Sequence, residues 1–150
     1  KIIVFSDPLC PACQKTIPNI IEKVNKNNNI ALYYYHFPLL SIHPAALTLS
    51  KAMMVAKKNG IKNIEEKIYL TNFSAYFNPT ENNDQKILNG FNKIFKTNIT
   101  MKQINNNTLD EEIKDDINIG MKLGVNGTPT IYVNEVKDSS GSLLYNLQNK

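Results

Sequence analysis

Hydrophobic positions along the first third of the chain change from strand-like runs to helical spacing and back. Residues 2–5 (IIVF) form a β-branched and aromatic run that Ser6-Asp7-Pro8 ends, which predicts a buried strand leading into a loop. Apolar residues then recur at helical spacing over 17–24, until asparagines break the pattern. Residues 30–35 form a second strand-like run. Two strands with a helix-length crossover predict a parallel βαβ unit.

From Pro44 to about residue 107 the apolar residues fall only at helical periods, so this stretch is expected to be entirely helical. A capping box at Thr108 and Glu111 then predicts the start of a further helix that ends at Gly124. The helical signals inside the block are Ala45, Leu49, Ala52, Met53 and Ala56 on one face, Asn63 with Glu66 as a capping pair before Ile64 and Ile68, and Ile87, Phe91, Ile94 and Phe95.

The last part of the chain returns to strand-like sequence. Residues 130–133 (TIYV) predict a strand, and a tight turn at 134–135 joins it to a weaker partner strand that begins at Val136. Residues 141–150 are expected to add a short terminal helix.

These patterns predict an α/β fold in which a helical insertion interrupts a sheet domain. The sheet domain consists of residues 1–43 and 108–150, and the insertion consists of residues 44–107. A length of 150 residues is sufficient for one hydrophobic core, and no apolar run approaches the roughly 20 residues that span a bilayer.

The charge distribution argues against nucleic-acid binding. The net charge is +4, and all positive side chains are lysines because the chain contains no arginine. These lysines are scattered among asparagines and acidic residues instead of forming a stripe, and arginine is the residue that usually recognises phosphates and bases. No nucleic-acid partner is therefore expected.

The only two cysteines, Cys10 and Cys13, are three positions apart where a strand leads into a helix. This spacing puts both sulfurs on one turn, where they can form a reversible disulfide. The helix N-terminus stabilises a thiolate on Cys10, which is therefore expected to attack, whereas Cys13 is expected to be buried and to resolve mixed disulfides. Two alternatives remain: a pair of reduced core cysteines, and half of a metal site shared between chains.

A second candidate feature is the loop Gly124-Val125-Asn126-Gly127-Thr128-Pro129, which precedes the strand at Thr130. It is an ordinary turn or, given the cysteine pair, a loop whose Thr128-Pro129 bond is cis and faces the sulfurs. In the second case the backbone of Thr128 is free to pair with an extended peptide, and Pro129 packs over the disulfide. Pro11 and Ala12, between the cysteines, join Thr128 as expected substrate contacts.

Five segments together resemble the DsbA family of bacterial thiol-disulfide oxidoreductases, over nearly the whole chain. The segments are Phe5-Ser6-Asp7, Cys10-Pro11-Ala12-Cys13, His36-Phe37-Pro38-Leu39, His43-Pro44-Ala45-Ala46 and Gly127-Thr128-Pro129-Thr130. The resemblance implies a thioredoxin-like fold with a helical insertion. It also implies that Cys10 is the nucleophile, Cys13 the resolving thiol and Pro129 the cis-proline.

The same resemblance implies a bacterial protein that is periplasmic or otherwise exported. Such a protein oxidises cysteine-containing polypeptides as they fold, and a membrane redox partner reoxidises it. The chain begins directly in a strand-like run, which suggests that an N-terminal piece with an export signal precedes Lys1. The sequence does not predict an oligomeric state.

Two positions depart from the family pattern. Many relatives carry a buried acid where this chain has Val4, so the proton of Cys13 is expected to move through water or another group. The strongest oxidants have a histidine where this chain has Ala12, so a milder oxidant is expected. Thr128 also occurs in disulfide isomerases and does not separate an oxidase from an isomerase.

The leading hypothesis is a dithiol oxidase that needs no cofactor and no metal. Alternatives are a disulfide isomerase or reductase, and a non-catalytic module that binds copper or zinc through the cysteine pair, although two thiolates alone make an incomplete site. His36, at a strand end, and His43, as a helix cap, are interpreted as structural residues.

Overall fold

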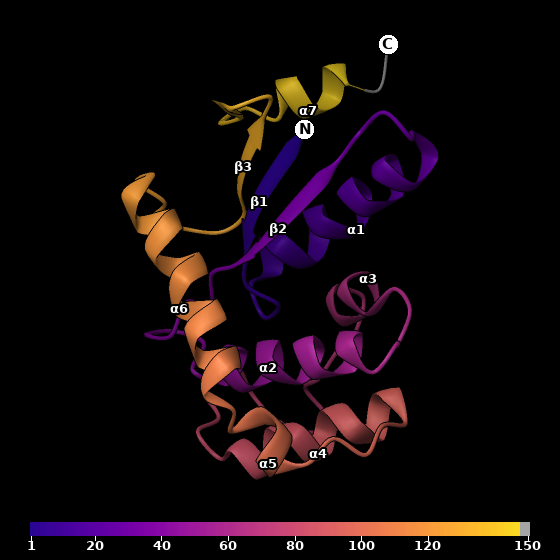
Figure 1. Ribbon diagram of the computed structural model, residues 1–150, viewed down its shortest axis with the longest axis vertical. Coiled ribbons are helices and arrows are strands. Elements are labelled where there is room, and N and C mark those ends of the chain that lie inside the picture. Colours follow the sequence, from indigo (N-terminus) through magenta and orange to yellow (C-terminus); the bar gives the residue numbers. More distant parts are fainter. Residues whose placement is uncertain (148–150) are drawn as a thin grey trace.

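The computed structural model describes residues 1–147 and contains a four-stranded sheet in the order β2-β1-β3-β4 (Figure 1). β1 and β2 are parallel, with Val4 opposite Tyr34, and β3 runs antiparallel to both β1 and β4. The predicted βαβ unit and the α/β class are confirmed. The strands are β1 (Ile2–Ser6), β2 (Leu32–His36), β3 (Thr130–Val133) and β4 (Val136–Lys137).

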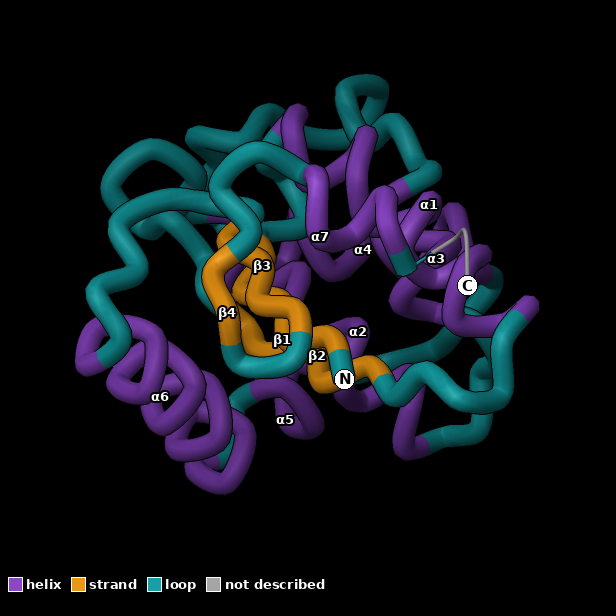
Figure 2. The backbone as a smooth tube through the Cα atoms, turned by 90° about the horizontal axis from the view of Figure 1, so that it is seen from above, coloured by secondary structure: helices purple, strands orange, loops and turns teal. Residues whose placement is uncertain are grey.

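Helices cover both faces of this sheet. α1 (Pro11–Lys26) buries Ile17 and Ile20 against the face that contains Ile2 and Val4. α6 (Asn107–Lys122) lies on the opposite face, where Phe5, Phe37 and Val125 form a smaller core (Figure 2). Because side chains alternate along a strand, β1 serves two cores at once and is the central strand of the fold.

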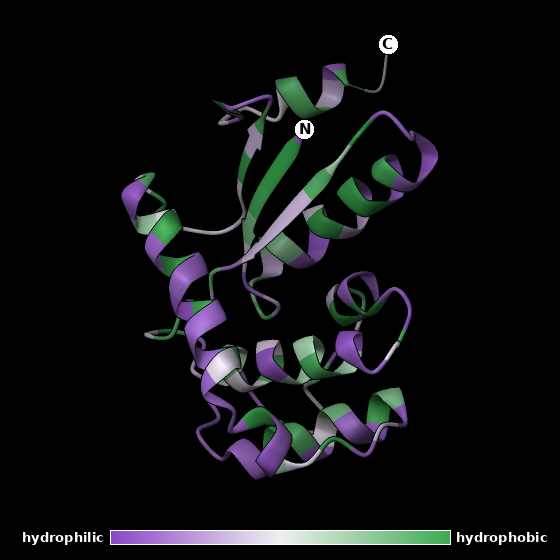
Figure 3. Ribbon diagram, viewed as in Figure 1, coloured by the Kyte–Doolittle hydropathy of each residue, from purple (hydrophilic) through white to green (hydrophobic). Residues whose placement is uncertain are grey.

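The approach of α6 to the sheet depends on Gly120. A Cβ atom at this position would lie 2.7 Å from Phe37 and 3.1 Å from Phe5, closer than side chains pack. Elsewhere α6 is mostly hydrophilic (Figure 3), and its exposed side is covered with charged residues. The helix therefore contacts the sheet through a narrow stripe in which a side chain at Gly120 would not fit.

Between β2 and α6 the described chain forms helices and loops, with no strand. α2 is the most buried of these helices: Ala45, Leu49, Ala52 and Ala56 are fully buried. The predicted helical block is thereby confirmed as helical. The helices are α2 (Ala45–Lys58), α3 (Ile64–Tyr69), α4 (Asp84–Phe95) and α5 (Met101–Ile104).

Two predicted capping interactions do not form. Asn63 is the N-cap of α3, as predicted, but its backbone is left-handed (φ 58°) and its side chain makes no capping hydrogen bond. At α6 the capping residue is Asn106, whose Oδ1 accepts from the Thr108 N–H at 2.8 Å. Thr108 thus lies within the first turn, and the capping box with Glu111 does not form.

The C-terminal hairpin agrees with the prediction. Asn134 and Glu135 have φ of 48° and 72°, the left-handed pair that a tight β-hairpin turn requires. The terminal helix is α7 (Ser142–Asn146), and residues 148–150 of the predicted helix lie outside the described residues.

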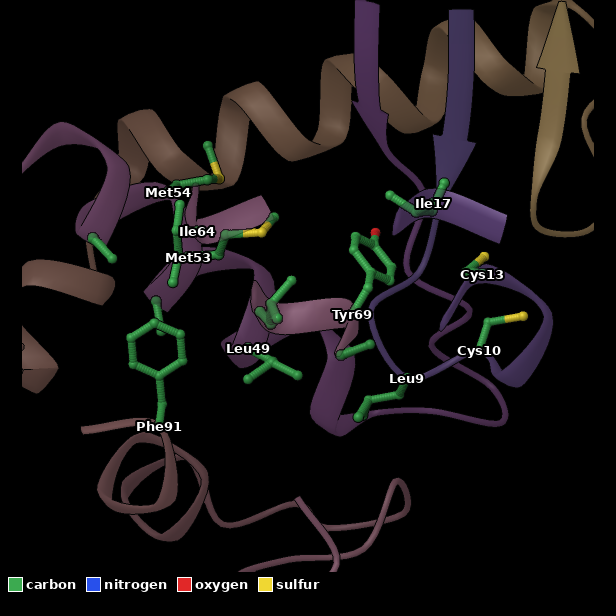
Figure 4. Close-up of a cluster of buried hydrophobic side chains, with 14 of the residues drawn as sticks. Leu9, Cys10, Cys13, Ile17, Leu49, Met53, Met54, Ile64, Tyr69 and Phe91 are labelled. Carbon is green, nitrogen blue, oxygen red and sulfur yellow. The ribbon is translucent and has the colours of Figure 1, made fainter. Parts of the chain in front are cut away.

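One continuous hydrophobic core runs from the sheet into the helical block. It connects Val4 and Ile17 with Leu49, Ile64 and Phe91 (Figure 4). The division of the chain into two domains at residues 44 and 107 stays a prediction. Within residues 1–147 no helix combines the length and the apolar character that a membrane crossing requires.

Candidate active site

The loop between β1 and α1 is organised by the buried carboxylate of Asp7. Its Oδ1 accepts from the Leu9 N–H at 2.7 Å, and its Oδ2 accepts from the Leu39 N–H at 2.9 Å. The same Oδ2 lies 2.9 Å from Nδ1 of His43. The backbone oxygen of Asp7 accepts from the Cys10 N–H at 3.1 Å. Asp7 therefore fixes the turn that presents Cys10.

Cys10 occupies the N-cap position of α1. Its backbone is extended (φ −73°, ψ 122°), and its side chain makes no capping hydrogen bond. Pro11 takes the first helical position, so the N–H groups of Ala12 and Cys13 begin the helix without intrahelical acceptors. Cys10 thus lies at the positive end of the dipole of a 16-residue helix.

The loop before β3 lies against this sulfur. Sγ of Cys10 donates a hydrogen bond to the backbone oxygen of Thr128 at 3.3 Å, and the Thr128-Pro129 peptide bond is cis. The hydroxyl of Thr130 donates to the Gly127 oxygen at 2.7 Å, which holds the loop closed. The structure therefore brings together Cys10, Thr128 and the cis-proline, as the sequence predicts.

Cys13 is fully buried, and both cysteines are free thiols. Burial raises the pKa of Cys13 to about 12, and the neighbouring Cys10 adds to this rise. Hydrogen bonds from the Ser6 hydroxyl, the Asp7 backbone and the Thr128 hydroxyl act in the opposite direction. Among these three groups the Ser6 hydroxyl lowers the pKa most. At neutral pH Cys13 is a protonated thiol.

The sequence did not reveal a group of three buried hydroxyls beside Cys13. Tyr69 of α3 donates to Oγ of Ser6 at 2.7 Å, and Tyr34 of β2 is hydrogen-bonded to Tyr69. Figure 4 shows the Tyr69 ring extending from α3 toward Ile17 of α1, with its hydroxyl oxygen at the far end. Burial raises the pKa of both phenols, so both stay protonated.

Both histidines make their hydrogen bonds to aspartates and not to the cysteines. His43 is paired with Asp7, and the N-cap position of α2 belongs to Pro44, so His43 is not the cap that the sequence predicts. The His36 N–H donates to Asp116 at 2.8 Å. Burial lowers the pKa of His36 to about 4 and raises that of Asp116 to about 6. In the described part of the chain, no three His, Cys, Asp or Glu side chains gather as metal ligands.

The surface next to the cysteines is formed by Pro11 and Ala12, which are both exposed. With Gln14 and Lys15 they line a mostly apolar depression of about 580 Å³ at the start of α1.

Comparisons with known proteins agree on the fold. The model of the thioredoxin family matches residues 1–142, whereas curated protein sequences give no match. A thioredoxin-like oxidoreductase from Silicibacter pomeroyi superposes with a TM-score of 0.70 at 16% identity, covering 99% of this chain and 86% of that chain. The thiol-disulfide exchange protein alpha-DsbA2 from Wolbachia pipientis gives 0.68 at 18% identity, covering 99% and 79%. The DsbA disulfide interchange protein from Klebsiella pneumoniae gives 0.65 at 20% identity, covering 95% and 76%.

Proposed function

Since the chain belongs to the thioredoxin family, we propose that it is a thiol-disulfide oxidoreductase of the DsbA type that oxidises cysteine-containing polypeptides. The contact between the Cys10 sulfur and the Thr128 oxygen, 3.3 Å long, carries this proposal. It places a thiol at a helix N-terminus beside a backbone segment to which an extended peptide can pair. Pro129, the other half of the cis bond, completes the site.

The catalytic cycle begins with a disulfide between Cys10 and Cys13. A substrate thiolate attacks the Cys10 sulfur, the bond to Cys13 breaks, and Cys13 takes the electron pair and a proton. A second substrate thiolate then attacks the substrate sulfur of the mixed disulfide and releases Cys10 as a thiolate. Two electrons have passed from the substrate dithiol to the enzyme, and the substrate carries a new disulfide.

The direction of transfer follows from the different environments of the two sulfurs. The helix N-terminus stabilises the Cys10 thiolate, which favours the reduced enzyme and makes the disulfide an oxidant. Ala12 supplies no further positive charge between the cysteines, so we expect an oxidant milder than the strongest members of the DsbA family. Thr128, Pro11 and Ala12 are the proposed contacts for the substrate peptide.

DsbA-type proteins are exported, and we extend this to the present chain. We propose that it acts in the bacterial periplasm or is otherwise exported, with cysteine-containing polypeptides as substrates and a membrane redox protein as the partner that reoxidises it. The structural relatives support this proposal through their fold.

The proposal is tested by measuring the reduction potential against glutathione and the oxidation of a peptide with two cysteines. An oxidase has a potential well above that of thioredoxin, about −270 mV, and forms the peptide disulfide stoichiometrically. A potential near that of thioredoxin, together with reduction of insulin, would instead indicate a reductase. Stoichiometric bound zinc or copper without exchange activity would favour the metal-binding alternative.

Substitution of each cysteine tests the assigned roles. Cys10→Ser should abolish peptide oxidation. Cys13→Ser should leave Cys10 able to form a mixed disulfide with the peptide that is not resolved, and this adduct is detected by mass spectrometry. If Cys13→Ser forms no adduct while Cys10→Ser does, the two roles are reversed.

A further inference from the structure

The buried thiol of Cys13 has no carboxylate to exchange its proton with. Val4 is fully buried and apolar, and it pairs in register with Tyr34 on β2. The carboxylate of Asp7, in the loop before α1, already uses both oxygens on Leu9, Leu39 and His43. The proton that Cys13 gains or loses during disulfide exchange therefore requires another route.

The three hydroxyls of Ser6, Tyr69 and Tyr34, which we call the hydroxyl chain, begin at this sulfur. Tyr69 donates its only proton to Ser6, at 2.7 Å, so in the bond between the two phenols Tyr34 is the donor. The Ser6 hydroxyl, which lowers the pKa of Cys13, then has its own proton free to move to that sulfur. All three hydroxyls thus donate in the direction of the sulfur. Rotation of the three O–H bonds reverses the direction of donation.

The surroundings suit transfer between neutral hydroxyls. Tyr69 is 2% exposed and Ser6 is fully buried, so water does not compete for the hydrogen bonds within the chain. The Tyr34 ring lines a cavity of about 360 Å³ between α1, β2, α2 and α3. Lys57 and Glu65 line the same cavity, which has room for several water molecules and polar partners to hold them.

We propose that the hydroxyl chain carries the proton of Cys13 between its sulfur and water in the cavity beside Tyr34. When the Cys10 disulfide opens, the electron pair of the broken S–S bond goes to Cys13. Ser6 then gives its proton to Cys13, Tyr69 gives one to Ser6, Tyr34 gives one to Tyr69, and water replaces the proton of Tyr34. When the disulfide forms, the same protons move in reverse. The inference rests on the proposed function only in requiring exchange between Cys10 and Cys13.

The test follows the two steps in which oxidised glutathione oxidises the reduced protein. In the first step Cys10 attacks glutathione disulfide, and Cys13 takes no part. In the second step Cys13 loses its proton and attacks Cys10, which releases reduced glutathione. Samples quenched with acid and resolved by mass spectrometry give both rates. The variants are Tyr69→Phe and Tyr34→Phe, each of which removes one hydroxyl of the chain and retains the ring.

In both variants the first step should keep the wild-type rate within about twofold, and the second should slow by about 100-fold, the low end of acid–base contributions. The glutathione adduct of Cys10 then accumulates. The reduction potential should stay unchanged, because a proton route alters rates in both directions equally. The control is Tyr35→Phe, whose ring stacks on Phe5 on the opposite face of the sheet, with centroids 5.0 Å apart.

If folded Tyr69→Phe and Tyr34→Phe complete the second step at the wild-type rate, the proposed proton route is wrong. Equal slowing of both steps, or a shifted reduction potential, would also overturn it, because either result indicates a structural role of the tyrosines. Ser6→Ala, which removes the hydroxyl next to the sulfur, provides a third variant if one tyrosine substitution fails to fold. Exchange with glutathione tests proton transfer through the hydroxyl chain, whereas oxidation of the two-cysteine peptide tests the proposed function. Exchange with glutathione but no oxidation of the peptide would therefore overturn the proposed function without contradicting proton transfer through the hydroxyl chain.

Discussion

The sulfur of Cys10 lies 3.3 Å from the backbone oxygen of Thr128, although 118 positions separate the two residues in the chain. This contact connects the start of α1 with the loop before β3. Cys10 lies at the N-terminus of α1 and is 8% exposed, whereas Cys13 is fully buried. The two thiols are therefore expected to differ in reactivity.

Alkylation should distinguish the two thiols. With iodoacetamide at pH 7 to 9, the reduced protein should be modified at Cys10 alone. Burial raises the pKa of Cys13 to about 12, so its thiolate fraction, which grows with pH, stays small until the pH approaches that value. Peptide mapping by mass spectrometry identifies the modified residue. The Cys10→Ala variant, which retains only Cys13, should remain unmodified over the same range, and rapid labelling of that variant while folded would contradict the assignment.

Removal of the Asp7 carboxylate should destabilise the protein. Asp7→Ala leaves the N–H groups of Leu9 and Leu39 without acceptors, and a buried unsatisfied group costs about 1–3 kcal/mol. The free energy of unfolding, measured by urea denaturation, should fall by about 2–6 kcal/mol for the two groups together. Asp115→Ala, at an exposed acid on α6, is the control and should change stability by less than about 0.5 kcal/mol.

A side chain at Gly120 should push α6 away from the sheet. Gly120→Ala places a methyl group 2.7 Å from Phe37, and such overpacking costs about 1–3 kcal/mol even though alanine favours a helix. Gly127→Ala, where a Cβ meets nothing within 4 Å, should leave the melting temperature nearly unchanged. Adding Phe37→Leu to Gly120→Ala should recover part of the loss. A stable Gly120→Ala protein would show that α6 can shift without cost.

Asp116 should make stability depend on pH. Burial raises its pKa from 3.8 to about 6, so the folded state binds more protons than the unfolded state between these values. The ionised carboxylate therefore costs stability that increases as the pH rises from about 4 to 6. Asp116→Asn, which can still accept from the His36 N–H, should stabilise the protein at pH 7.5 by about 1 kcal/mol, after allowance for partial exposure.

At pH 4 this gain should largely disappear, because the wild-type carboxyl is then protonated in the folded state. Burial lowers the pKa of His36 to about 4, so both proteins lose stability as the pH falls from about 6.5 toward 4, and this loss cancels in the comparison. Urea unfolding at the two pH values measures the difference. An equal difference at pH 4 and pH 7.5 would assign the effect to packing instead of ionisation.

The sequence predicts what local patterns determine. Strand runs, helical periods and the position of Cys10 at a helix start depend on neighbours in the chain, and the structure contains them. Helix starts were less predictable where polar residues cluster. Three asparagines at 105–107 offer several caps before α6, and Asn106 is the one that bonds Thr108. The left-handed backbone of Asn63 has no counterpart in the hydrophobic pattern.

The hydroxyl chain could not be predicted in the same way. Ser6, Tyr34 and Tyr69 come from three different elements, and a tyrosine on a strand or a short helix is usually a packing residue. Their hydroxyls meet only because α3 packs against α1 below the end of β1. The contacts of Asp7 with Leu39 and His43 cannot be predicted from local sequence patterns either.

The carboxylate of Asp7 has a mechanical consequence. It binds the turn before Cys10 through Leu9, and it binds the turn that enters α2 through Leu39 and His43. One side chain therefore links the two turns to each other. A ligand that displaces the N-terminus of α2 would also displace the reactive sulfur. A displacement in the helical part of the molecule would then reach the loop that carries Cys10 through one side chain.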